Sequence, residues 1–300
     1  MKQTSSLLLL WPHQASTKKS WNAEFAFLLL AVFILSSFLT PPKLTIQWNT
    51  QEKGLWLANP DMPQKSSHAD SKVTILKVDP TLFNFHLVMA TENGLEKKTV
   101  DTWCKEKNLV AGINAGMFHG YTNKPEWSGL VNTGYTRNYK HLNNPNFSND
   151  KAFIAFHPKD PKLPEFQIID KTCQDLPGLL KKYETVVQGI RVMDCKKKVV
   201  WVQDQKKWSM CLLCTDEDRN VLFVHCRSPY TVHNFMKQLL QLLPNINRAI
   251  YLEGGPESSL YLDTEKEKLS LMGSYETGFW ENDNNNRLWP LPNVIGFSRK

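Results

Sequence analysis

A carboxylate followed by two glycines, at the end of an apolar run, is the feature of this sequence that points most directly to chemistry. Ala249–Leu252 is apolar with a β-branched centre, which is typical of a buried strand, and it leads into Glu253, Gly254 and Gly255. Glycines lack Cβ atoms and let a ligand approach the backbone closely. The pattern predicts Glu253 at the mouth of a strand, beside a turn that either only reverses the chain or also contacts a ligand.

Two further loops combine glycines with polar side chains. Leu109–Ile113 is a second apolar run, and it ends at Asn114, whose amide both donates and accepts hydrogen bonds, followed by Gly116. A third glycine-bounded stretch, residues 125–134, carries Glu126 and an indole. Each loop alone is ordinary turn chemistry, and their recurrence favours a ligand site.

The order of these segments resembles the phosphodiester glycosidase family, which includes the N-acetylglucosamine-1-phosphodiester α-N-acetylglucosaminidase (uncovering enzyme) domain. The matching segments span roughly residues 70–298 and are Asn114-Ala115-Gly116-Met117-Phe118, Gly129-Leu130-Val131 with Gly134, Lys151–Phe156, Gln188-Gly189-Ile190-Arg191, Leu252-Glu253-Gly254-Gly255 and Leu291–Phe297. The resemblance implies an α+β fold with a mixed, largely antiparallel β-sheet core and a few packed helices. It also implies a carbohydrate or sugar-phosphate substrate.

Cleavage of a glycosyl phosphodiester makes specific demands on a site. The leaving phosphate is a weak base and needs little help from a general acid, but a cation must hold it and a carboxylate must activate water or attack the sugar carbon. We assign Glu253 as base or nucleophile, Glu257 and Glu126 as second carboxylates and His119 as a proton relay. The predicted substrate-binding residues are Asn114, Gly116, Arg191, Gly254, Gly255 and Ser258.

Arg191 is the predicted phosphate-binding cation, because a guanidinium binds phosphate oxygens bidentately. The alternative for this residue is a surface salt bridge with Asp194.

Two positions depart from the family pattern and leave the function open. Glu253 stands where the family usually has Asp, and Pro256-Glu257 stands where Gly-Ser often follows. The first interpretation is an exported, membrane-anchored hydrolase that cleaves a sugar-1-phosphodiester in a surface glycan, exopolysaccharide or glycolipid. The second is a non-catalytic polysaccharide-binding or envelope-assembly protein of the same fold.

A metal-assisted phosphodiesterase is a third interpretation. The polar run Glu281–Asn286 lacks the glycine and terminal Glu of a calcium loop, so it is typical of a polar turn. We expect no metal site and no cofactor.

The N-terminus carries a targeting or anchoring segment. Residues 25–42 form an uncharged, mostly apolar run at the lower edge of a membrane span, and Lys18 and Lys19 precede it. This arrangement predicts a cytoplasmic segment 1–24, an anchor 25–42 and a main domain in the periplasm, outside the cell or in a lumen. Phe38 and Leu39 stand where a cleavage site needs small residues, which favours an uncleaved anchor over a cleaved signal and a secreted protein.

The cysteines and the net charge bear on three other kinds of site: disulfides, metal or redox centres, and nucleic-acid interfaces. All six cysteines follow the anchor, and disulfides are compatible with their even number, but the connectivity stays open. Cys211 and Cys214 fall on an expected strand, where residues three apart face opposite sides, so we expect structural thiols rather than a metal or redox pair. The net charge of +7 is spread thinly, and Lys196–Lys198 is typical of a solvated turn. We expect no nucleic-acid partner, and the oligomeric state stays open.

The remaining pattern predicts the scaffold. We expect a linker or leading strand over residues 43–71 and the phosphodiester-glycosidase-like domain over residues 72–300. Lys72–Val78 and Phe83–Met89 are predicted strands that form a hairpin-like pair around Asp79-Pro80. Other expected strands are residues 184–188, 199–202, 209–213 and 221–225, and expected helices are residues 99–107 and 230–243. The second helix is expected to return Glu253 beside the strand that precedes it.

Overall fold

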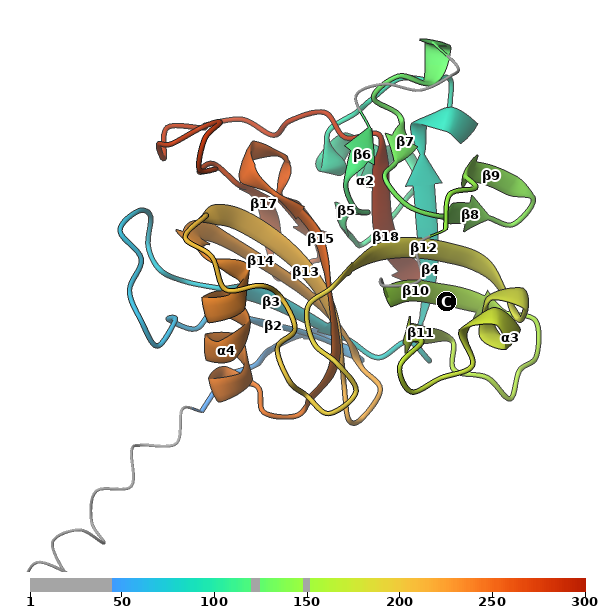
Figure 1. Cartoon of the computed structure of the whole chain (residues 1–300), viewed down its shortest axis with the longest axis horizontal. Coiled ribbons are helices and arrows are strands. Elements are labelled where there is room, and N and C mark those ends of the chain that lie inside the picture. Colours follow the sequence, from blue (N-terminus) through green and yellow to red (C-terminus); the bar gives the residue numbers. More distant parts are fainter. Residues whose placement is uncertain (1–44, 120–124, 148–151) are drawn as a thin grey trace, which may run out of the picture. The chain divides into compact units, whose positions relative to one another are not determined.

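A computed structural model of the protein describes residues 45–119, 125–147 and 152–300 (Figure 1). The predicted cytoplasmic segment 1–24 and anchor 25–42 lie outside the described residues. Within the part of the chain that is described, no helix has both the length and the apolar character needed to span a membrane.

The domain is built on two antiparallel sheets (Figure 1). The strand order of the larger sheet is β1 (Asn49–Glu52), β2 (Leu55–Ala58), β3 (Thr74–Val78), β14 (Val221–Tyr230), β13 (Trp208–Asp216), β15 (Ile246–Gly254), β12 (Tyr183–Arg191), β10 (Ala152–Pro158) and β11 (Phe166–Asp170), and β8 (Thr136–Asn138) and β9 (His141–Asn144) attach at β12. The order of the smaller sheet is β17 (Lys268–Met272), β16 (Ser259–Asp263), β5 (Ala111–Asn114), β18 (Asn293–Arg299) and β4 (Phe83–Met89). β6 (Phe118–His119) and β7 (Val131–Asn132) pair with each other in a separate two-stranded sheet.

Every strand pair in the described residues is antiparallel. The predicted α+β class with a largely antiparallel core is confirmed.

The main hydrophobic core lies between the two sheets. Leu213 and Phe223 of the larger sheet belong to the same buried cluster as Phe85 and Phe297 of the smaller sheet. The ring centroid of Phe85 lies 5.9 Å from that of Phe297 and 6.4 Å from that of Phe223. Burial of each such side chain stabilises the fold by about 1.5 to 3 kcal/mol. This core fixes the sheet edges at which the polar loops lie.

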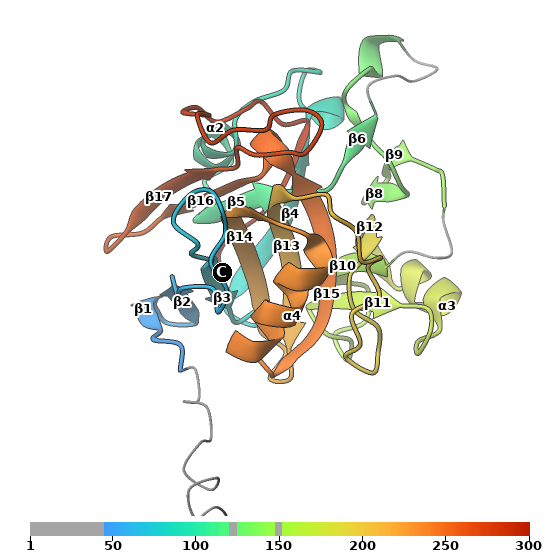
Figure 2. The ribbon, with the colours of Figure 1, turned by 60° about the vertical axis from the view of Figure 1, so that its left-hand side comes forward.

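Three α-helices in the described residues cover the outer faces, namely α2 (Val100–Glu106), α3 (Leu176–Lys181) and α4 (Val232–Leu242). Figure 2 shows α4 in front of β13 and β15. It begins at Thr231, whose side chain accepts a hydrogen bond from Asn234 N, and it buries Phe235, Met236 and Leu239 against the larger sheet. Both predicted helices, residues 99–107 and 230–243, are confirmed. The short 3-10 turns are η1 (Ala90–Glu92), η2 (Pro125–Trp127) and η3 (Gly255–Glu257).

The predicted hairpin around Asp79-Pro80 is wrong. Both strands form, but β3 pairs with β2 and β14 in the larger sheet, whereas β4 pairs with β18 in the smaller sheet. The connection crosses from one sheet to the other, because residues of both strands bury their apolar faces in the core between the sheets.

Of the two alternatives for residues 43–71, the leading strand is present: β1 and β2 pair with each other, β2 pairs with β3, and Leu55 is fully buried. Two other expectations about the scaffold need correction. No strand forms over residues 199–202, where Val199 makes only an isolated bridge with Met193. β15 does not return beside β14, because β13 lies between them.

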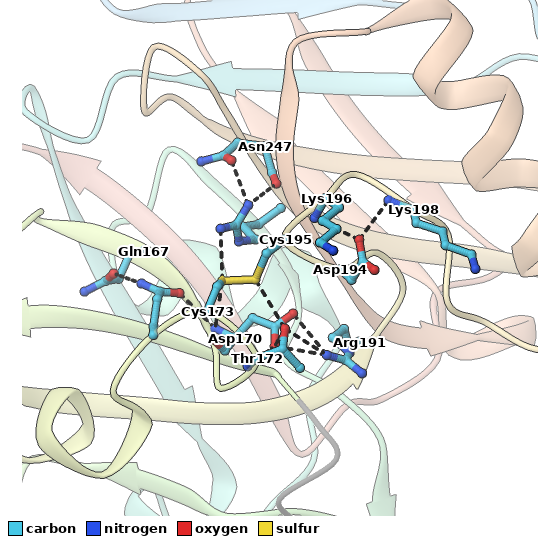
Figure 3. The surroundings of a disulfide bond; sticks show 12 residues. Gln167, Asp170, Thr172, Cys173, Arg191, Asp194, Cys195, Lys196, Lys198 and Asn247 are labelled. Carbon is cyan, nitrogen blue, oxygen red and sulfur yellow. Dashed lines mark hydrogen bonds and ion pairs between the residues drawn. A yellow bond between two sulfur atoms is a disulfide. The ribbon is translucent and has the colours of Figure 1, made fainter.

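The predicted opposite orientation of Cys211 and Cys214 on one strand is confirmed. Cys211 belongs to the core between the sheets and Cys214 to the core under α4, so the two thiols lie on opposite faces of β13. Cys173 and Cys195 form a disulfide that links the turn after β11 to the turn after β12 (Figure 3).

The disulfide predicts a measurable contribution to stability. Replacing Cys173 and Cys195 by Ser should lower the free energy of unfolding by about 3 kcal/mol, because the bond closes a loop with a sequence separation of 22 residues. Chemical denaturation of the two proteins tests this, and added reductant should destabilise only the parent protein. Equal stability of the oxidised and reduced parent would contradict the prediction.

Candidate active site

The loop that carries Glu253 begins at a β-bulge. Along the β13–β15 pair, Leu212 lies opposite Tyr251 and Cys211 lies opposite Glu253, so Leu252 is an extra residue on β15. A bulge interrupts the alternation of side chains and bends the strand. It directs Glu253 away from the position that regular pairing would give it. The strand end predicted for this residue is present.

The two glycines after Glu253 are required by close neighbours. A Cβ on Gly254 would overlap Tyr251 Oη and the indole of Trp208. Gly255 has a φ of +66°, and a Cβ there would overlap the carboxylate of Glu276. Because neither glycine has a Cβ, the rings of Tyr251 and Trp208 and the carboxylate of Glu276 can lie directly against the loop.

Three carboxylates share this region and influence one another. Burial first, and then the charges of Glu257 and Glu276, raise the pKa of Glu253 to about 8, against a hydrogen bond of 3.0 Å that Gly254 N donates to Glu253 Oε1. Burial also raises the pKa of Glu257 and of Glu276. At neutral pH Glu253 therefore retains its proton, which is the state of a proton donor rather than of a base.

The predicted binding residues Asn114, Gly116 and Ser258 lie beside this loop. Asn114 Oδ1 accepts a hydrogen bond of 3.2 Å from Ser259 N, and Ser258 Oγ donates to Glu253 O at 3.3 Å. A Cβ on Gly116 would lie 4.0 Å from Leu252 O. The loops after β5 and β15 therefore meet, as the sequence predicts. Asn114 is 1% exposed, and its Nδ2 has no hydrogen-bond partner among the described residues.

A buried amide network that the sequence analysis misses supports the neighbouring hairpin. Asn132 is its centre: its backbone N donates to Asn143 Oδ1 at 2.9 Å, its Nδ2 donates to Thr136 Oγ1 at 2.9 Å, and its Oδ1 accepts from Asn293 Nδ2. Asn144 Nδ2 donates to Asn132 O. The network joins β7, β8, β9 and β18 and holds the strands around the Asn114 loop.

Arg191 has another partner than the one predicted. Its Nη1 donates to both carboxylate oxygens of Asp170, at 3.0 and 3.2 Å, and Asp170 is 1% exposed (Figure 3). Asp194 instead accepts from the backbone of Lys196 and Lys198, in the turn predicted for the lysine run. The guanidinium therefore neutralises a buried carboxylate beside the disulfide, which does not favour its use as the phosphate-binding cation.

Glu126 and His119 are exposed, in η2 and on β6 respectively. Among the interactions that the structure describes, none joins either side chain to Glu253, Glu257 or Glu276. Their catalytic roles stay predictions.

Four residues beside the predicted site are not among the site residues predicted from sequence: Tyr251, Trp208, Glu276 and Lys97. The ring centroids of Tyr251 and Trp208 lie 6.4 Å apart, and Trp208 forms a β-bridge with Glu276. Glu276 lies between Gly273 and Gly278, and this glycine-bounded carboxylate is a signal that could have found it. Among the described side chains, no group of three His, Cys, Asp or Glu residues is placed to hold a metal ion.

Comparison with known proteins identifies the class. The family model of the phosphodiester glycosidases matches residues 107–298, and the chain belongs to this family. No curated protein matches the sequence.

Two solved structures share the fold. A hypothetical protein from Synechocystis matches with a TM-score of 0.57 at 12% identity, over 87% of this chain, and this chain spans 64% of that protein. The catalytic domain of zebrafish N-acetylglucosamine-1-phosphodiester α-N-acetylglucosaminidase, described as auto-inhibited by its pro-peptide, matches with a TM-score of 0.54 at 11% identity, over 85% of this chain and 82% of that domain.

The raised pKa of Glu253 predicts a pH-dependent stability. Its pKa is about 8 in the folded protein and near 4.5 in the unfolded chain, so between these values only the folded state binds the proton, and stability falls as pH rises. From pH 5 to pH 9, the free energy of unfolding of the parent should fall relative to that of Glu253→Gln by roughly 2 to 4 kcal/mol. Urea unfolding at both pH values measures this, and an unchanged difference would contradict it.

Proposed function

We propose that the protein hydrolyses the glycosidic C–O bond of a sugar-1-phosphodiester in a glycan or glycolipid. One observation carries the proposal: the glycine loop of a phosphodiester glycosidase places Glu253, with a pKa of about 8, beside Glu257 and Glu276. Carboxylates with raised pKa values in a shared environment are typical of acid–base catalysis on glycosidic bonds.

The protonation states support a division of roles between two carboxyl groups. The substrate phosphate is anionic, and a protonated Glu253 donates a hydrogen bond to it where an ionised one would repel it. As the bond between the anomeric carbon and the bridging oxygen breaks, the phosphate leaves with the electron pair and takes the Glu253 proton. The role of Glu253 is then the reverse of the base predicted from sequence.

Glu257 acts on the sugar carbon. Burial and the charge of Glu276 raise its pKa, against its own backbone N–H and the charge of Lys97, which lower it. Its ionised form either accepts a proton from the attacking water or forms a bond to the anomeric carbon that water later cleaves. The products are a free sugar and a phosphate monoester.

We propose further that the domain works outside the cytosol, anchored by residues 25–42. The uncharged run and its preceding lysines support this, and so does the Cys173–Cys195 disulfide, since such bonds persist in oxidising compartments. Fractionation of cells that express the full chain, or a chain that starts at residue 43, tests it. Recovery of the full chain in the soluble cytosolic fraction would contradict it.

The activity assay uses a panel of α- and β-linked sugar-1-phosphodiesters and measures release of reducing sugar. Glu257→Gln should lower kcat by about 10²- to 10⁴-fold, because it removes the group that activates water or attacks the sugar carbon, and Glu253→Gln should lower it by less, because the leaving phosphate is a weak base. Glu106→Gln, on an exposed carboxylate of α2, is the matched control and should keep the parent rate.

Two results would contradict the proposed enzymatic function. Parent rates in both glutamine variants would remove the assigned roles. Absence of release from the whole panel, together with polysaccharide binding that Glu253→Gln leaves intact, would favour the binding protein of the same fold.

A further inference from the structure

Lys97 brings a positive charge to the carboxylate loop from a part of the chain outside the family motifs. It lies just before α2 and its side chain is exposed. Its Nζ is 5.5 Å from the ring centroid of Phe118 and 3.5 Å from the place where a Cβ on Gly129 would lie. Its charge also acts on Glu257. The ammonium group therefore lies where three segments of the family motif approach one another.

The position of Lys97 matters because the site contains three carboxyl groups. Among the described residues, Lys97 is the only lysine or arginine whose charge acts on Glu253, Glu257 or Glu276. Arg191, the cation predicted from sequence, is engaged by Asp170. A phosphodiester entering beside three carboxyl groups adds a further negative charge, which needs a nearby cation.

The surroundings of Lys97 suit a phosphate ligand. An ammonium group is a compact charge with three rotatable donors, which bind phosphate oxygens without fixed geometry. The Phe118 ring attracts the cation from one side. Gly129, with a φ of +72°, has no side chain to fill the space next to Nζ.

We infer that Lys97 binds the phosphate group of the substrate and makes the site select a sugar-1-phosphodiester over a neutral glycoside. This inference rests on the proposed function. It also gives the substrate a direction, with the phosphate on the side of Lys97, Phe118 and Gly129.

The test compares the parent protein with Lys97→Met and Lys97→Arg. The matched control is Lys98→Met, because Lys98 is the next residue but its Nζ pairs with Glu106 at 2.7 Å and lies over the Trp103 ring. Two substrates with the same sugar are used, a sugar-1-phosphodiester and a neutral p-nitrophenyl glycoside. Binding of the sugar-1-phosphate is measured separately by calorimetry.

Lys97→Met should raise KM for the phosphodiester by about tenfold to a hundredfold, because it removes a charged hydrogen bond to phosphate. The rate on the neutral glycoside should stay within about threefold of the parent, and Lys97→Arg should recover part of the loss. Raising the salt from about 0.05 to about 0.5 M should weaken phosphodiester binding in the parent and leave Lys97→Met little changed.

Other outcomes separate the inference from the proposed function. An equal loss on both substrates would mean that Lys97 only tunes Glu257, and no loss on either would place it outside the site; each overturns the inference. If the parent hydrolyses neither substrate, the proposed function fails and calorimetry decides the inference. Sugar-1-phosphate binding that Lys97→Met abolishes then supports it, and binding that is absent or equal in both proteins overturns it.

Discussion

The interruption of the β13–β15 pairing by one extra residue is the constraint on which the site depends. From Ala249 to Tyr251, after an earlier register shift at Asn247, β15 is a regular buried strand between two cores, and its side chains alternate between them. Leu252 is the inserted residue, and the strand then delivers a carboxylate at a sheet end. Without the bulge, the residue at position 253 would fall on the other face of β15. The group that is costly to bury is thus carried by a strand that is paired on both sides, with β13 and β12.

That cost is met by protonation and by the packing of the loop. An ionised carboxylate in an apolar setting loses hydration worth several kcal/mol, so Glu253 stays neutral instead. Bonds from neighbouring elements hold the turn after it: Ser258 Oγ donates to Ser209 O on β13, and Asn114 on β5 accepts from Ser259 N. The site is therefore tied to both sheets, and a change in either core would move it.

The sequence predicts the residues that lie at strand ends well. It predicts poorly the contacts that depend on how separate strands are arranged in the sheets. Asn114, Gly116, Gly254 and Ser258 meet because each follows or flanks a buried apolar strand, and such runs are visible in sequence. Arg191 has a different role because Asp170, its partner, comes from β11, whose place beside β10 no local pattern encodes.

The same reason explains two other failures. Asp79-Pro80 has the composition of a hairpin turn, yet the strands on either side belong to different sheets. Glu276 lies on a loop that reaches the site through long-range contacts, among them its bridge to Trp208 and the hydrogen bond that Ser209 N donates to Tyr275 O. The predicted anchor, residues 25–42, lies outside the described residues and stays a prediction.

The two departures from the family motif gain a common explanation from the electrostatics. Glu253 replaces the usual Asp and Glu257 follows a proline where Gly-Ser is common. Burial raises the pKa of both groups, and that of Glu253 reaches about 8. Among the described cations, Lys97 acts on Glu257 and none acts on Glu253, so the environment favours a proton on Glu253 more strongly than on Glu257. Two identical carboxyl groups then differ in proton affinity because of their neighbours, which is the condition for one to donate a proton while the other accepts one. A turn that carries two glutamates is therefore compatible with a division of roles between them, provided that Lys97, the described cation on the Glu257 side, remains.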